Sequence, residues 1–180
     1  MDHPQEWHGQ PVRIIRRILS ALSDTDQPLI GYAFKAALIS VVPSLVVGFV
    51  ALPLLPGTPL PIQLDIHTGP MLFGIAVLVS PWLETLLMWP VLWLLGRLTR
   101  NPIHQALMST AFWALLHAIR RPARALCVAW GFFVFSVCFL AWKRRSTGSA
   151  LLATGFTHSF DNLFILMAWA ATEGNGCGTD

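Results

Sequence analysis

Long apolar segments, separated by short clusters of charged residues, make up most of the chain. They cover residues 29–55, 70–98, 125–142 and 149–171, with a shorter segment at 105–119. An α-helix rises about 1.5 Å per residue, so about 20 apolar residues are needed to cross ~30 Å of hydrocarbon. The pattern therefore predicts an all-α, polytopic membrane helix bundle with about five transmembrane helices.

The N-terminal part has a different pattern, in which apolar and basic residues alternate. Between residues 12 and 22, apolar side chains recur with helical spacing, and Arg13, Arg16 and Arg17 lie between them. A basic amphipathic helix of this kind lies in the plane of an anionic membrane surface. We therefore predict a cytoplasmic N-terminal segment (1–28) with an interfacial helix, a membrane-embedded bundle (29–172) and an acidic C-terminal tail (173–180).

Basic residues outside the apolar segments predict the orientation. With a cytoplasmic N-terminus, five crossings place Arg13, Arg16, Arg17, Arg97, Arg100, Lys143, Arg144 and Arg145 inside, and Arg120, Arg121 and Arg124 outside. The excess of positive charge inside is the distribution that the positive-inside rule expects. The pattern thus indicates a multi-pass integral membrane protein, for which we expect the bacterial cytoplasmic (inner) membrane.

Composition agrees with a lipid-embedded protein. Hydrophobic residues make up 54% of the chain and charged residues 12%, whereas soluble domains contain about 25% charged residues. The net charge of +3 is explained by topology, so the lipid bilayer is the expected partner and nucleic acid is not. The three cysteines show no CxxC spacing, which gives no indication of a structural zinc site or a disulfide framework.

Four polar side chains interrupt the apolar segments at a similar depth. Glu84 and His117 each lie ~20 Å from the predicted cytoplasmic end of their helix, and His158 and Asn162 lie ~17 and ~22 Å from theirs. An ionised carboxylate in hydrocarbon costs roughly 2.5–3.5 kcal/mol on insertion scales, so Glu84 needs polar neighbours. The common depth predicts one polar pocket shared by three helices, and Asp161 can reach its edge.

The order of these residues resembles the CPBP family, also called the Abi or CAAX-protease family, of glutamic intramembrane proteases. That family carries Glu-Glu-xxx-Arg, Phe-xxx-His and His-xxx-Asn motifs on separate membrane helices. The similarity covers a protease-like core at about residues 80–167. The third motif is complete as His158 and Asn162, and the second keeps its histidine as His117.

Three other motif positions carry different residues. The first motif keeps Glu84, but Thr85 and Trp89 stand where the family has Glu and Arg. In the second motif, Trp113 occupies the aromatic position, and Phe112 lies beside it.

The resemblance implies hydrolysis of a peptide bond in a membrane-embedded or lipidated peptide or protein, without a metal or another cofactor. Glu84 would be the general base, and His117 would hold the same water and pass a proton to the leaving amine. His158 and Asn162 would donate hydrogen bonds to the oxyanion of the tetrahedral intermediate.

Two other functions fit part of the pattern. His117 and His158 could be the axial ligands of a haem in a small membrane cytochrome, although this leaves Glu84 and Asn162 without a role. The remaining alternative is a catalytically inactive family member that binds a peptide or lipid, as a bacteriocin immunity protein would.

Overall fold

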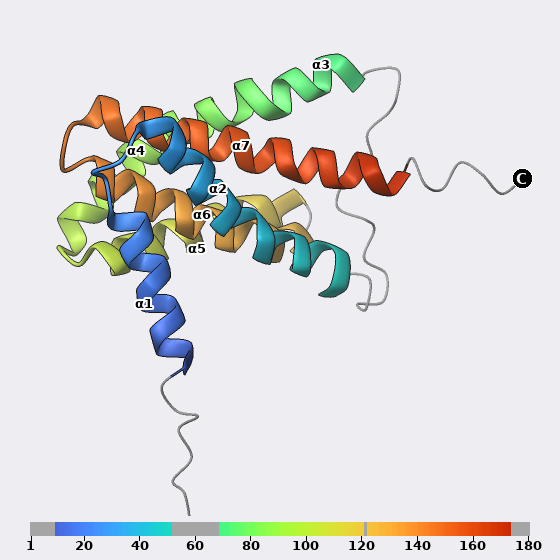
Figure 1. Cartoon of the computed structure of the whole chain (residues 1–180). Helices are drawn as coiled ribbons and strands as arrows, with labels where there is room; N and C mark the ends of the chain where they lie inside the picture. The colour runs from blue at the N-terminus through green and yellow to red at the C-terminus, as the bar shows by residue number, and fades with distance from the viewer. Residues whose placement is uncertain (1–9, 52–68, 121, 174–180) are drawn as a thin grey trace, which may run out of the picture.

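The computed structural model describes residues 10–51, 69–120 and 122–173 (Figure 1). In order, the elements are α1 (Gln10–Ser23), α2 (Leu29–Val46), the π-helical turn η2 (Val47–Ala51), α3 (Gly69–Gly74), the π-helical turn η5 (Ile75–Val79), α4 (Ser80–Leu98), α5 (Pro102–Arg120), α6 (Pro122–Trp142) and α7 (Thr147–Glu173). All regular secondary structure within these ranges is helical, which confirms the all-α prediction.

The predicted segments and the observed helices differ mainly at their ends. α5 begins at Pro102 rather than at residue 105, because Asn101 caps it: its Oδ1 accepts the backbone N–H groups of Ile103 at 2.9 Å and His104 at 3.3 Å. At the other end of the chain, α7 includes Glu173, which was assigned to the acidic tail. Residues 52–68 and 174–180, which include most of the predicted acidic tail, lie outside the described residues.

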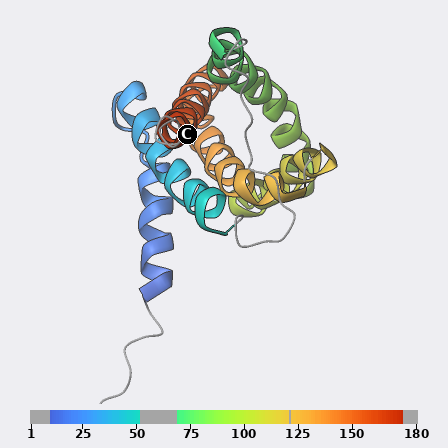
Figure 2. The same cartoon turned by 90° about the vertical axis from the view of Figure 1, so that its right-hand side faces the viewer.

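α7 packs against three other helices of the bundle. α2, α4 and α6 all pack against it, and α5 forms an antiparallel hairpin with α6 (Figures 1 and 2). Small buried residues permit close approach of α2 and α7, as is common between membrane helices. They are Ala33, Ala36 and Ala37 on α2, and Ala150 and Ala153 on α7.

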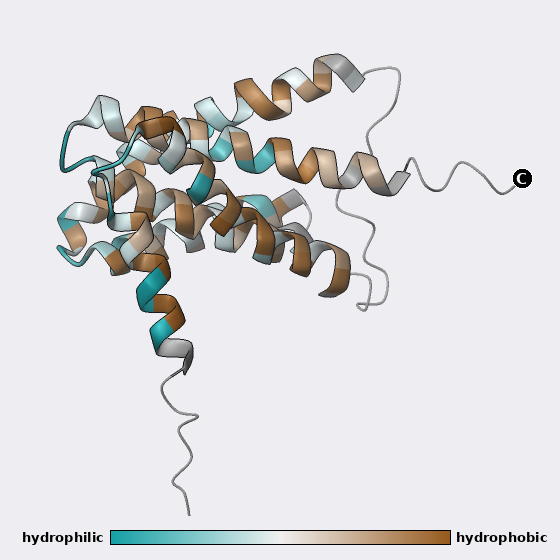
Figure 3. Ribbon diagram, viewed as in Figure 1, coloured by the Kyte–Doolittle hydropathy of each residue, from teal (hydrophilic) through white to brown (hydrophobic). Residues whose placement is uncertain are grey.

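Three helical segments are long and apolar enough to cross a membrane: Leu29–Val50, Met71–Leu98 and Ala125–Trp142. Within the described ranges, α5 and α7 are not among them, although both were predicted to cross. Large apolar side chains are exposed along α4, including Leu83, Leu87 and Leu94, and such a surface suits contact with lipid. In Figure 3, hydrophobic residues lie along most of the helices, and hydrophilic residues lie in the connections at one end of the bundle.

A proline inside α2 removes a backbone donor, and a neighbouring helix replaces it. Pro43 has no N–H group, so the carbonyl of Ile39, four residues earlier, lacks its helical partner. The indole Nε1–H of Trp130 on α6 donates to this carbonyl at 2.9 Å. In hydrocarbon a freed carbonyl must find a partner within the protein, so this bond ties α6 to the irregular part of α2.

α1 runs across the direction of the other helices at one end of the bundle (Figures 1 and 2). Its C-terminal end is anchored, because Leu22 is buried and its carbonyl accepts the Tyr32 hydroxyl at 2.7 Å. Towards its N-terminal end, Ile14 and Ile15 are 57% and 55% exposed, and Arg17 is exposed as well. The helix therefore presents both apolar and basic side chains outside the bundle.

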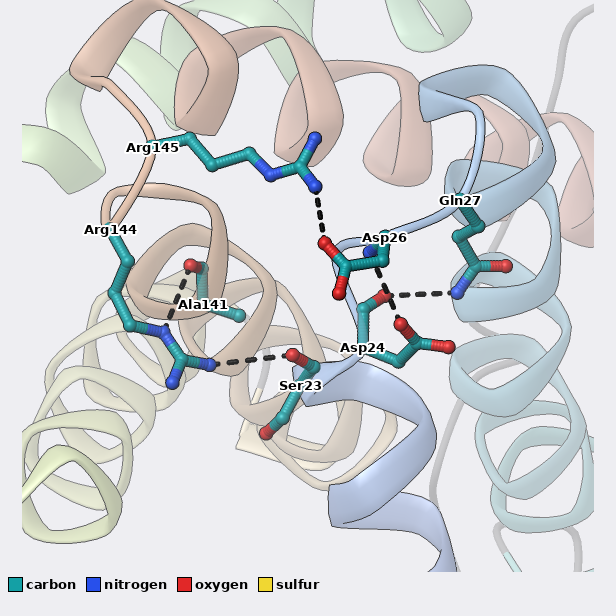
Figure 4. Close-up of polar contacts among 7 residues, drawn as sticks. All are labelled: Ser23, Asp24, Asp26, Gln27, Ala141, Arg144 and Arg145. Atoms are coloured by element: carbon teal, nitrogen blue, oxygen red, sulfur yellow. Dashed lines mark hydrogen bonds and ion pairs between the residues drawn. The ribbon is translucent and has the colours of Figure 1, made fainter.

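Polar contacts join the α6–α7 connection to the α1–α2 connection (Figure 4). The guanidinium of Arg145 forms a 2.6 Å ion pair with Asp26, and Arg144 donates to the backbone carbonyl of Ser23 at 3.3 Å. The ion pair is largely exposed, and exposed pairs contribute little to stability, typically ~0–1 kcal/mol. Its clearer consequence is geometric, since together with the bond from Arg144 to Ser23 it joins the α1–α2 connection to the α6–α7 connection.

We predict that Gly155 sets the distance between α4 and α7. A Cβ atom at this position would lie 3.0–3.2 Å from three ring carbons of Trp82 on α4. Gly155→Ala should therefore force the helices apart, at an overpacking cost of about 1–3 kcal/mol that outweighs a helix-propensity gain of about 1 kcal/mol. The expected result is a lower Tm of the purified protein in detergent.

Gly148→Ala is the matched control, because Gly148 lies on the same helix and its added Cβ would meet its nearest neighbour at 3.9 Å. Its Tm should stay the same or rise. An equal or higher Tm for Gly155→Ala would contradict the proposed close contact.

Candidate functional site

A cavity of about 180 Å³ lies among the helices and is lined by all four predicted site residues. Glu84 comes from α4, His117 from α5, and His158 and Asn162 from α7. Most of the remaining lining is apolar and comes from α2, η2 and α6. The structure thus brings together side chains that are separated by up to 78 positions in the sequence (162 − 84).

Glu84 is held by a neighbour on its own helix. Ser80, four residues earlier and therefore on the same face, donates its hydroxyl to Glu84 Oε1 at 2.8 Å. The other carboxylate oxygen, Oε2, lies 3.6 Å from His158 Nε2, and the glutamate side chain is 24% exposed. One carboxylate oxygen is therefore fixed, while the other faces an imidazole at a distance slightly longer than a hydrogen bond.

The orientation of His117 is fixed by its own backbone. Its Nδ1 lies 2.8 Å from the carbonyl oxygen of Trp113, so Nδ1 must carry the proton that is donated. In the neutral imidazole, Nε2 is then left with a lone pair. The Trp113 ring stacks on Phe132 of α6 at a centroid distance of 4.9 Å, which packs this turn of α5 against α6.

His158 is buried, with 4% of its surface exposed. Its ring stacks on Phe135 of α6 at a centroid distance of 4.2 Å, and Phe132 makes an edge contact at 5.7 Å. Nε2 is the atom nearest Glu84, while Nδ1 has no hydrogen-bond partner. Aromatic packing, rather than hydrogen bonding, therefore holds this imidazole in place.

Asn162 replaces a backbone donor that the helix lacks. In the π-helical turn, the N–H of Ser80 donates to Ile75, and Pro81 has no N–H group. The carbonyl of Ala76 thus loses its usual helical donor, and Asn162 Nδ2 donates to it at 2.7 Å. This bond ties α7 to the irregular turn immediately before the helix that carries Glu84.

Two residues of the site received no firm role from sequence reasoning. Ser80 was not singled out, although its i, i+4 spacing from Glu84 was a signal for the bond it makes. Asp161 was expected at the edge of the pocket; the structure places it in the cavity lining, 4% exposed, with its Oδ1 lacking a hydrogen-bond partner.

The residues that depart from the first family motif are not part of the cavity lining. Thr85 is fully buried and its hydroxyl has no hydrogen-bond partner. Trp89 is 44% exposed on the outer surface of α4. Thr and Trp are also uncharged, so the charges of the family's Glu and Arg have no counterpart at these two positions.

The site combines an anchored carboxylate, an imidazole with an available lone pair, a buried imidazole and a side-chain amide. Such groups can remove a proton from a water molecule and donate hydrogen bonds to a developing negative charge. Among the residues that the structure describes, no group of three or more His, Cys, Asp or Glu side chains is arranged to hold a metal ion.

Comparison with known proteins gives no match, whether the sequence is compared with protein-family models, with curated proteins or with solved structures. The resemblance to the CPBP family therefore remains an expectation from its motifs. Function has to be argued from the chemistry of the site itself.

Proposed function

We propose that the protein is an intramembrane, metal-independent endopeptidase of the CPBP type, which hydrolyses a peptide bond in a membrane-associated protein or peptide. The observation that carries this proposal is the convergence of Glu84, His117, His158 and Asn162 on one cavity. These residues come from three helices and match the order of the family motifs. A shared packing role would not require four different polar groups to face the same space.

The proposed reaction begins with a water molecule held between Glu84 and His117. Glu84 takes a proton from the water, whose oxygen attacks the carbonyl carbon of the scissile bond. The His117 Nε2 lone pair, left available by the bond from Nδ1–H to Trp113, accepts a hydrogen bond from the same water. As the C–N bond breaks, the proton reaches the leaving amine through His117.

His158 and Asn162 would stabilise the oxyanion that forms on the carbonyl oxygen. Such donors are effective when they are fixed before the charge appears. Stacking on Phe135 fixes the His158 ring, and the bond to Ala76 fixes the Asn162 amide. One N–H of Asn162 is used in that bond, so the second N–H is the one available to the substrate.

The site is proposed to lie within a five-crossing bundle. α2, the α3–α4 segment, α5, α6 and α7 alternate in direction, so their termini lie at two opposite ends of the bundle (Figure 1). The basic residues Arg97, Arg100, Lys143, Arg144 and Arg145 follow or end the helices at one of these ends, which we assign to the cytoplasm. α1 would then rest on the inner surface of the bacterial cytoplasmic membrane, with Ile14 and Ile15 in contact with lipid.

The cavity supports a haem-binding function less well than the proposed peptidase function. Its volume of about 180 Å³ is below the roughly 300–1,000 Å³ that is usual for sites binding drug-sized ligands and cofactors. In addition, the Phe132 ring contacts both His117 and His158, at centroid distances of 5.3 and 5.7 Å, and so occupies space beside the proposed axial ligands.

Glu84→Gln is predicted to abolish cleavage, because the amide cannot accept the proton of the attacking water. The loss should be about 100-fold or more. Wild type and variant, each in lipid nanodiscs, would be incubated with solubilised membrane proteins, and newly formed N-termini would be quantified by mass spectrometry. New N-termini that depend on the wild-type glutamate would support the mechanism.

Asp24→Asn is a matched carboxylate-to-amide control, since Asp24 is exposed in the α1–α2 connection. It should cleave like the wild type. Equal cleavage by wild type and Glu84→Gln would contradict the mechanism.

The proposed topology makes a separate prediction for the α6–α7 connection. Five crossings place residue 146 in the cytoplasm, whereas crossing by only the three most apolar segments would place it outside. In a variant without native cysteines, Ser146→Cys should therefore resist a membrane-impermeant maleimide added to intact cells. Thr58→Cys should react under both topologies and serves as the positive control; labelling of Ser146→Cys in intact cells would exclude five crossings.

A further inference from the structure

The cavity has an apolar wall without a role in the proposed mechanism. The candidate catalytic groups come from α4, α5 and α7, whereas α2, η2 and α6 contribute mostly apolar side chains to the lining. The apolar wall includes three aromatic rings and two glycines, which are Phe49, Phe132, Phe135, Gly48 and Gly131. The glycines are informative, because each marks a place where a side chain is missing beside the site.

The glycine at position 48 is required neither by the backbone nor by helix packing. Its φ does not lie in the left-handed region that favours glycine. Among the described residues, a Cβ atom added to Gly48 would meet one heavy atom within 4 Å, the Cys127 Sγ at 3.9 Å, which is an ordinary van der Waals contact. Glycine is less favourable than alanine within a helix, so this position loses stability that no described contact explains.

Gly131 on α6 shows the contrasting case. A Cβ atom added there would lie 3.3 Å from Ser40 Oγ on α2 and 3.5 Å from the Phe135 ring. A small residue is therefore needed at Gly131, as is common where membrane helices pack closely. At Gly48 there is free space instead, and it belongs to the cavity, because both Gly48 and Cys127 line it.

The volume of the cavity corresponds to one bulky apolar side chain. The cavity measures about 180 Å³, and an apolar cavity of roughly 150 Å³ can bind benzene, which has the size of a phenylalanine ring. The rings of Phe49, Phe132 and Phe135 offer surfaces on which another aromatic ring can pack. The same cavity presents the proposed catalytic groups, so the occupant would lie next to the reacting bond.

We propose that Gly48 is a specificity-determining residue, whose missing side chain leaves room for one apolar side chain of the size of phenylalanine beside the bond that is hydrolysed. Naming this substrate class rests on the proposed peptidase function. Stability and binding can both be measured without cleavage, so the two proposals can fail separately.

The first test asks whether the glycine is needed for packing. Gly48→Ala should leave the Tm of the purified protein in detergent unchanged or raise it, because the added methyl group fits and alanine favours the helix. This is the opposite of the result expected for Gly155→Ala. A lower Tm would show that packing requires Gly48.

The second test measures binding of two fluorescent transmembrane peptides of about 22 residues, long enough to cross a bilayer. Their ends are Leu-rich, and their central sequence is Gly-Ala-Xaa-Ala-Gly, where Xaa is Phe or Ala. Each is co-reconstituted in vesicles with labelled full-length Glu84→Gln protein, which prevents cleavage, and association is measured by energy transfer. The Phe peptide should bind about fivefold more tightly, because its ring gains van der Waals contacts in space that the Ala peptide leaves unfilled.

Gly48→Leu in the same background should remove this preference, because the leucine side chain occupies the space. Gly31→Leu is the matched control, since Gly31 begins the same apolar segment at an exposed position where an added Cβ would have no described neighbour within 4 Å. It should keep the preference. Helix content by circular dichroism and elution as a single species would show that each variant is folded.

Four results would overturn the proposal: a lower Tm of Gly48→Ala, absent or equal binding of the two peptides, a preference that survives in Gly48→Leu, or a preference that Gly31→Leu removes as well. Equal binding is the result expected if a lipid acyl chain fills the cavity. Selectivity for the Phe peptide without glutamate-dependent cleavage would leave the subsite intact and remove the peptidase function instead.

Discussion

Polar groups in a hydrocarbon environment must find their partners inside the protein, and this constraint explains the irregular parts of the bundle. Proline leaves a backbone carbonyl without its helical donor, and here a side chain from another helix replaces that donor twice. Trp130 donates to Ile39, which lies one turn before Pro43, and Asn162 donates to Ala76 before Pro81. Each replacement is also an interhelical contact, so the prolines determine which helices must lie together.

The second replacement places the candidate site. The bond from Asn162 to Ala76 holds α7 against the π-helical turn that leads into α4, while the close approach of Gly155 and Trp82 holds the next part of the same interface. Glu84 follows Trp82 by two residues, and its carboxylate consequently reaches within 3.6 Å of His158. Asn162, which the sequence indicates as a site residue, therefore has a structural function, and its substitution would affect packing whatever its role in the proposed reaction.

Hydrophobic patterning was sufficient to predict the helices and the common depth of the polar residues, because both follow from helical geometry. It could not predict the number of crossings equally well. α5 and α7 carry the very residues that form the site, including His117, His158 and Asn162, and these lower the hydropathy of the helices that hold them. Local patterns also could not show the π-helical turns, the bond between Asn162 and Ala76, or the burial of Asp161, since each depends on which helix packs against which.

The charge of the cavity follows from the same packing. At the first motif, Trp89 stands where the resembling family has an arginine, and its side chain is 44% exposed rather than directed into the cavity. Two acidic residues, Glu84 and Asp161, thus face a space whose described lining includes no Lys or Arg. Burying like charges together is unfavourable unless hydrogen bonds or cations compensate. Ser80 and His158 provide polar neighbours for Glu84, whereas Asp161 Oδ1 is inaccessible to solvent and the Ser40 hydroxyl is the polar group beside this carboxyl. The Ser40 hydroxyl of α2 and the Asp161 carboxyl of α7 are therefore buried together between these helices, which leaves Glu84 as the partly exposed acid of the cavity.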